Sequence, residues 1–281
     1  MNIVHKSHPS NSMVRWLLVI SKFIMRSTLL DRSIRKPNTL PISQPNDTVK
    51  STYGGLDVYS FNKTSNHHVI YLHGGAYKNQ MMKMHFDFAR DLANKSNATV
   101  HIIDYPLLPE GTVDVTVPKT IECIHELMTT NKIQSIYLSG DSAGGGLALS
   151  VAHQMPHNTI KELFLLSPWL DVSTTNEGIE YLIKKDPILS VKGLQKCGND
   201  YALNRPKDPI ASPLYEENEL PQPLHIYAGT HDLLFPDVLK YEYLHQDINL
   251  HVFHKAVHCC SIIPGTKAKN DTLHDISSHI S

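Results

Sequence analysis

The hydrophobic positions of this chain form short apolar runs that alternate, from about residue 57 onward, with longer segments of helical periodicity. The runs are rich in branched and aromatic residues and predict strands at 57–61, 67–75, 98–107, 135–140, 162–170, 224–230 and 249–256. Apolar residues three or four positions apart predict helices at 85–97, 116–131, 143–155 and 237–246. Pro118 is expected in the first turn of the second helix, where its missing N–H does no harm. This alternation predicts an α/β fold with a mostly parallel central sheet and helices on both faces.

The N-terminal segment differs from this pattern. Residues 13–30 are strongly apolar, but Arg15, Lys22 and Arg26 recur at spacings of seven and four, which places three cations on one face of a helix. This predicts an amphipathic helix and not a membrane span. We expect it to pack over the rest of the protein, with peripheral membrane contact as the alternative. A proline-rich stretch at 36–47 follows. We therefore divide the chain into an N-terminal helical segment and linker, 1–45, and one α/β domain, 46–281.

The amino-acid composition of the chain argues against several classes of function. Lys and Arg number 26 against 27 Asp and Glu, so the net charge of −1 gives no reason to expect a nucleic-acid partner. The four cysteines show no metal-binding or C-x-x-C spacing and are expected to be reduced thiols in a cytoplasmic protein. The 18 histidines contain no tight pair at zinc-binding spacing. No metal ion or cofactor is therefore expected.

One glycine-flanked serine follows a predicted buried strand. Gly140-Asp141-Ser142-Ala143-Gly144 is a G-x-S-x-G motif between a strand and a helix, the context in which a strained turn exposes a nucleophile. The alternative is a glycine-rich turn whose serine caps the helix. The position of the motif favours Ser142 as a nucleophile.

A second motif, His73-Gly74-Gly75, follows an earlier strand. Attack of a serine on an ester places negative charge on the carbonyl oxygen, and fixed N–H donors must stabilise that charge. We predict an oxyanion hole formed by the N–H groups of Gly74, Gly75 and Ala143, the last at the start of a helix. The alternative is a tight turn before the next helix. Both motifs in this order favour the oxyanion hole.

A base and its orienting acid are expected after the nucleophile. Asp232 follows the strand at 224–230, and His258 follows the last predicted strand, which gives the order Ser, Asp, His. A carboxylate that fixes the histidine tautomer leaves the other ring nitrogen facing Ser142. The weaker alternatives are Asp237, His231 and His254.

Together these motifs resemble the hormone-sensitive-lipase-like branch of the α/β-hydrolase esterases. The resemblance rests on HGGAY, DYPLLPE, GDSAGGG, SPWLD, DPILS and AGTHDLLFPD and extends over about residues 53–275. It implies a Ser142–His258–Asp232 triad and cofactor-free hydrolysis of small carboxylic esters with short to medium acyl chains. It also implies a small helical cap, made from the N-terminal helical cap segment within 1–45 and an insertion at about 172–215.

Three departures from the family pattern accompany this resemblance. Ala76 replaces a third glycine, Pro106 stands where the family usually has Arg, and Cys259-Cys260 follow the histidine in place of a small and an aromatic residue. None removes a reacting atom, although the last two affect the expected shape of the acyl pocket. A ligand-binding receptor on the same fold and an amidase or peptidase remain alternatives. A homodimer formed through an edge strand is a further expectation.

Overall fold

A computed structural model of the protein describes residues 4–7, 45–62, 64–245 and 247–280. The predicted amphipathic helix at 13–30 lies outside these residues. Within them, no helix is both long and apolar enough to cross a membrane.

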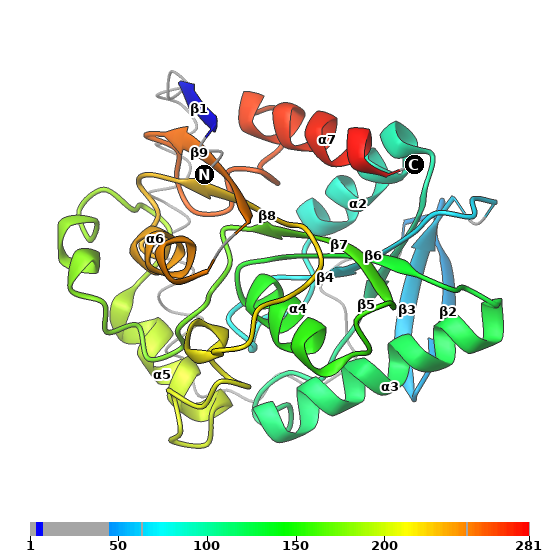
Figure 1. Ribbon diagram of the computed structural model, residues 1–281, viewed down its shortest axis with the longest axis horizontal. Coiled ribbons are helices and arrows are strands. Elements are labelled where there is room, and N and C mark those ends of the chain that lie inside the picture. Colours follow the sequence, from blue (N-terminus) through cyan, green and yellow to red (C-terminus); the bar gives the residue numbers. More distant parts are fainter. Residues whose placement is uncertain (1–3, 8–44, 63, 246, 281) are drawn as a thin grey trace.

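A nine-stranded sheet forms the centre of the described chain (Figure 1). Its spatial order is β1-β9-β8-β7-β6-β4-β5-β3-β2. Strand β3 runs antiparallel to both of its neighbours, and all other pairs are parallel. The strands are β1 Val4–Ser7, β2 Val49–Tyr53, β3 Leu56–Phe61, β4 His68–Leu72, β5 Thr99–Ile103, β6 Ile136–Asp141, β7 Ile160–Leu166, β8 Leu224–Gly229 and β9 Ile248–His254. The predicted mostly parallel sheet is confirmed.

Helices cover both faces of this sheet. In Figure 1, α2 and α7 lie together on one side, and α3, α4 and α6 lie on the other. The two buried clusters match these layers because successive strand residues point to opposite faces: Val69 and Tyr71 belong to one cluster, Ile70 and Leu72 to the other. The α-helices are α2 Lys83–Ser96, α3 Val113–Asn131, α4 Ala143–Gln154, α5 Val191–Tyr201, α6 Phe235–Leu244 and α7 Lys267–His279.

The insertion between β7 and β8 contains little regular structure. It carries α5 and two short 3₁₀ helices, Glu177–Tyr181 and Pro213–Tyr215, within the predicted cap range 172–215. One aromatic pair attaches it to the loop after β4, because the rings of Tyr77 and Tyr201 stack with centroids 3.6 Å apart. The insertion therefore contacts the loop that follows the HGG motif.

Several elements differ from the sequence-based predictions. Helix α3 begins at Val113, so Pro118 lies inside the helix and not in its first turn. Val113, Val117 and Ile124 are buried along one face, and this packing outweighs the lost hydrogen bond. Strand β2 and helices α5 and α7 were not predicted. Residues 4–7, within the expected helical cap segment, form a strand that pairs with β9 at one edge of the sheet.

Candidate active site

Ser142 occupies a sharp turn between β6 and α4. Its backbone has φ 53° and ψ −121°, a conformation that is costly for a residue with a side chain. The flanking glycines permit the turn: a Cβ on Gly140 would lie 2.3 Å from Gly144 O, and one on Gly144 would lie 2.1 Å from Leu72 O. The G-x-S-x-G motif is therefore set by close backbone contacts.

The structure brings the predicted nucleophile, base and acid together. His258 Nε2 lies 3.0 Å from Ser142 Oγ, and His258 Nδ1 lies 2.9 Å from Asp232 Oδ2. All three residues are buried. Burial alone would lower the pKa of His258, but the carboxylates of Asp232, Asp186 and Asp141 outweigh it and raise that pKa above its usual value. This geometry allows one imidazole to take the Ser142 proton while the acid holds its other nitrogen.

The alternative acid and bases lie elsewhere. Asp237 Oδ1 accepts a hydrogen bond from Asn176 Nδ2 of the cap at 2.8 Å. His254 is exposed at the end of β9, and His231 is half-buried with its backbone N–H bonded to Ala256 O. The geometry therefore favours Asp232 and His258 over these alternatives.

The oxyanion-hole prediction needs a correction at Gly74. Its N–H donates to Asp141 Oδ1 at 2.9 Å and is not free to meet a substrate oxygen. Gly75, with φ 131°, and Ala76, with φ 55°, continue the turn. Among the described residues, no hydrogen bond uses the N–H of Gly75, Ala76 or Ala143. Ala76, predicted to be only a tolerated substitution, therefore supplies a free donor next to Gly75.

Asp141 was not identified from the sequence, although it lies inside the G-x-S-x-G motif. Its carboxylate accepts hydrogen bonds from Tyr71 Oη at 2.6 Å and from Gly74 N, and His85 Nε2 lies 3.6 Å away. Burial would raise the pKa of Asp141, but His85, Tyr71 and Gly74 together lower it to about 2. An ionised Asp141 thus fixes the HGG loop beside the nucleophile.

Asp186 is a second buried carboxylate that the sequence analysis did not select. It comes from the cap, in the DPILS motif, and is 1% exposed. Its oxygens accept the N–H groups of Ile188 at 2.7 Å, Leu189 at 2.9 Å and Leu233 at 2.9 Å. Burial, and then the nearby Asp232, raise the pKa of Asp186. Because Leu233 follows Asp232, this carboxylate joins the insertion to the loop that carries the candidate acid.

The unusual Cys259-Cys260 pair is buried, and both thiols are free. Cys259 Sγ lies 3.2 Å from His258 Nε2. The backbone N–H of Cys259 donates to Ser167 Oγ at 3.0 Å. Burial and the charge of Asp141 raise the pKa of the Cys259 thiol. The thiol therefore stays protonated beside the imidazole and does not compete with Ser142 as an anionic nucleophile.

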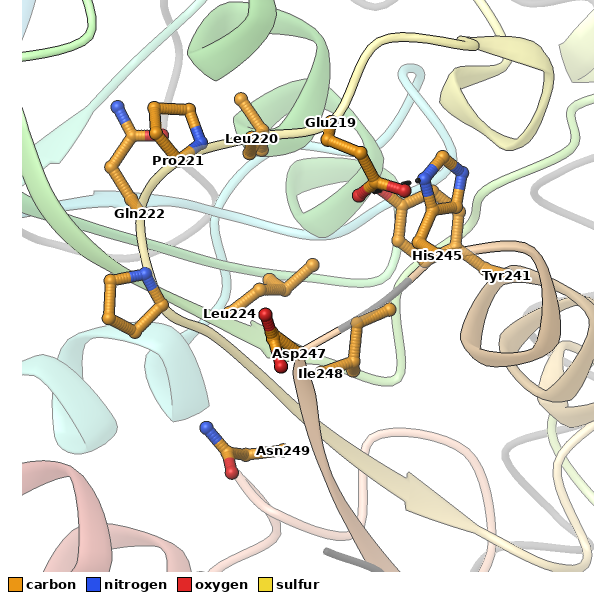
Figure 2. Close-up of a pocket in the computed structure, with 11 residues that line it drawn as sticks. Glu219, Leu220, Pro221, Gln222, Leu224, Tyr241, His245, Asp247, Ile248 and Asn249 are labelled. Carbon is orange, nitrogen blue, oxygen red and sulfur yellow. Dashed lines mark ion pairs between the residues drawn. The ribbon is translucent and has the colours of Figure 1, made fainter. Parts of the chain in front are cut away.

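A surface pocket lies away from this site, near the start of β8 and β9 and the end of α6 (Figure 2). Glu219 and His245 point toward one another across it, with Glu219 Oε2 3.5 Å from His245 Nδ1. Its lining residues are Glu219, Leu220, Pro221, Gln222, Pro223, Leu224, Tyr241, His245, Asp247, Ile248 and Asn249. None belongs to the triad, so this pocket is not the candidate reaction site.

A sequence profile for the alpha/beta hydrolase fold matches residues 69–261. An esterase of Acinetobacter venetianus is 30% identical over 183 residues, covering 62% of this chain and 59% of that protein. A triacylglycerol lipase of Mycobacterium tuberculosis is 31% identical over 200 residues, covering 69% of this chain and 41% of the lipase. The chain therefore spans less than two thirds of the length of these relatives.

Solved structures show the same architecture. A hormone-sensitive lipase from a metagenome library superposes with a TM-score of 0.80 at 20% identity, covering 96% of this chain and 97% of that chain. An esterase from the bacterial hormone-sensitive lipase family gives 0.79 at 22% identity, covering 97% and 98%. Together with the family profile and the esterase relative, these structures confirm the resemblance noted from the sequence motifs.

Proposed function

Because the chain belongs to the family of the alpha/beta hydrolase fold, we propose that it is a serine carboxylesterase that works through an acyl-enzyme. The observation that carries this proposal is the pair of hydrogen bonds that links Ser142, His258 and Asp232. Ser142 Oγ lies 3.0 Å from His258 Nε2, and His258 Nδ1 lies 2.9 Å from Asp232 Oδ2. The names of its relatives, esterase and triacylglycerol lipase, support the same reaction class.

Acylation begins at Ser142. Its Oγ attacks the ester carbonyl carbon while His258 Nε2 takes the proton, and Asp232 stabilises the imidazolium that forms. The carbonyl oxygen becomes an anion, which the N–H groups of Gly75, Ala76 and Ala143 stabilise; one such donor contributes about 3 to 4 kcal/mol in comparable enzymes. Collapse of the intermediate expels the alcohol, which receives its proton from His258.

Deacylation repeats these steps with water. His258 removes a proton from the water as its oxygen attacks the acyl-enzyme carbonyl, and the same N–H groups stabilise the second oxyanion. The carboxylic acid leaves when Ser142 Oγ recovers the proton from His258. Every proton transfer in this scheme is assigned to a residue of the chain itself.

The proposed substrates are small carboxylic esters with short to medium acyl chains. Tyr77 beside the HGG loop packs against Trp169, with centroids 5.9 Å apart, and against Tyr201 of the cap. All three rings are buried, so this aromatic group supports a closely packed setting for the HGG loop. The four buried free thiols support a reducing compartment such as the cytoplasm. Membrane contact through 13–30 and dimerisation through a sheet edge stay predictions.

A p-nitrophenyl ester series from acetate to dodecanoate tests the proposal. We expect turnover to be greatest at the shorter chains and to disappear in Ser142→Ala. Ser150→Ala is the matched control, because Ser150 is a buried serine of α4 whose Oγ donates only to Gly146 O. Hydrolysis that is equal in Ser142→Ala, or absent in the unmodified chain, would contradict the proposal and favour a binding role. Faster cleavage of the matching anilides would favour an amidase.

A further inference from the structure

Five metal-ligating side chains gather on the sheet face beneath α7, apart from the triad. They are Glu162 of β7, His225 of β8, His251 of β9, and Asp275 and His279 of α7. Figure 1 shows α7 along this side of the molecule, with β9 and β8 close by. His225 is the second residue of β8, whereas Asp232 follows the end of that strand. The cluster therefore lies nearer the amino-terminal ends of the parallel strands, whereas the reacting groups lie beyond their carboxyl ends.

Three of these residues already have the spacing of ligands around one ion. Glu162 Oε2 lies 3.1 Å from His225 Nε2 and 3.0 Å from His279 Nδ1. Tetrahedral zinc with bonds of about 2.0 to 2.1 Å separates its donor atoms by roughly 3.3 Å. All three donor atoms lie within 4.8 Å of one another.

A second set of donors adjoins the first. His251 Nε2 lies 3.4 Å from Asp275 Oδ2, and one nitrogen of His225 completes a group whose atoms all lie within 4.8 Å of one another. Tyr227 Oη donates to Asp275 Oδ2 at 2.7 Å and holds that carboxylate in place. Support of a ligand by an outer hydrogen bond of this kind is typical of metal sites.

His225 is the most deeply buried of these three residues, at 3% exposed. Its Nε2 faces Glu162, and among the described residues its buried Nδ1 has no hydrogen-bond partner. His225 thus belongs to both sets of donors, and a buried imidazole nitrogen left without a partner is one sign of a bound ion.

We propose that Glu162, His225 and His279 bind one divalent transition-metal ion, with zinc as the best-fitting ion, and that Asp275 and His251 flank it. Imidazole nitrogens favour zinc and its neighbours over magnesium or calcium, which take oxygen ligands. The Glu162 and His279 side chains are 20% and 37% exposed, which leaves a path for the ion from solvent. The bound ion joins α7 to β7 and β8. It takes no part in the proposed ester hydrolysis.

The test uses the full chain freed of metal by a chelator and titrated with Co²⁺. We expect a visible d–d absorption band that saturates at one ion per chain and disappears when Zn²⁺ is added. We also expect Zn²⁺ to raise the melting temperature, since it binds the folded form. No stoichiometric band, together with an unchanged melting temperature, would overturn the proposal.

Variants locate the ion. His279→Ala and Glu162→Gln change partly exposed side chains and are expected to weaken Co²⁺ binding by at least about tenfold. His274→Ala is the matched control, because His274 is an exposed residue of the same helix outside the cluster. Circular dichroism confirms folding, and ester hydrolysis is expected to stay within about twofold in all three variants. Equal binding in His279→Ala, Glu162→Gln and the control would place the ion elsewhere and refute this site.

Discussion

In the proposed mechanism, the protonation of one residue, His258, determines when the site can react. Only its neutral imidazole can take the Ser142 proton, and nearby carboxylates raise its pKa above the usual 6.5. The imidazole is therefore protonated at acid pH and becomes neutral as the pH rises through this raised pKa. We predict that kcat/KM rises with pH along a single limb whose midpoint lies above 6.5. A pH–rate profile measures the midpoint, and a limb centred well below that value would contradict the described environment.

Replacing the acid changes both the rate and this profile. In Asp232→Asn the carboxylate that orients His258 is lost, and kcat is expected to fall by up to about 10⁴-fold. Without the Asp232 charge, burial lowers the pKa of His258 with less opposition, so the pH limb is expected to move to lower pH. Asp237→Asn is the matched control, since that carboxylate bonds to Asn176 of the cap, and its activity is expected to stay within a few fold. Equal losses in the two variants would remove Asp232 from its assigned role.

Among the structural elements, the cap and the loop after β8 are joined through Asp186. Its buried carboxylate accepts three N–H groups, and one of them belongs to Leu233, which follows Asp232, the proposed acid. Leaving a buried donor without a partner costs about 1 to 3 kcal/mol. The cap is therefore expected to support the position of Asp232 as well as cover the site.

Asp186→Ala tests this connection. We predict a lower melting temperature and a kcat reduced by about tenfold or more, because a small displacement of a catalytic group is costly. Asp186→Asn keeps an acceptor oxygen and is expected to recover part of both losses. If Asp186→Ala were less stable but kept full kcat in the folded fraction, the residue would have only a structural role.

For the whole molecule, Asp141 links stability to the arrangement of the site. The pKa of Asp141 is about 2 in the folded protein, below the ordinary 3.8. The ionised carboxylate therefore stabilises the fold at pH values above 3.8, and this stabilisation is lost as the pH falls through 2. The difference between the two pKa values corresponds to a free energy of about 2 kcal/mol. We predict that Asp141→Asn lowers the unfolding free energy by about this amount at pH 7 and by less as pH falls below 4.

Denaturant unfolding across this pH range measures the effect. Asp114→Asn is the control, because Asp114 forms an exposed pair with Arg205 and is expected to contribute less than about 1 kcal/mol. A loss in Asp141→Asn that is independent of pH would show that the carboxylate charge is not its cause.

The sequence predicted the features that depend on short-range pattern. Ser142, Asp232 and His258 could be selected because each follows a strand, and parallel strands end at a common edge of the sheet. The hydrogen bond from Gly74 N–H to Asp141, 2.9 Å long, joins segments that follow two different strands. The spacing of the motifs along the sequence does not give the distance between such segments. Helix α7 was missed because KAKNDTLHDISSH has few apolar residues, and α3 was shortened because Pro118 was given more weight than its buried face.

The metal-ligand cluster was missed for a related reason. Its members extend from residue 162 to residue 279, and only Asp275 and His279 have helical spacing. Strand pairing and the packing of α7 bring them together, so a search for tight pairs of histidines could not find them.

The most direct test of the central claim is covalent labelling of the nucleophile. A fluorophosphonate that mimics the tetrahedral intermediate is expected to add once to the intact chain, at the peptide that contains Ser142, as measured by mass spectrometry. Labelling is expected to be lost in Ser142→Ala, to slow strongly in His258→Gln and to persist in Ser150→Ala. A chain that is not labelled, or one that is labelled equally in Ser142→Ala, would contradict the proposed serine esterase.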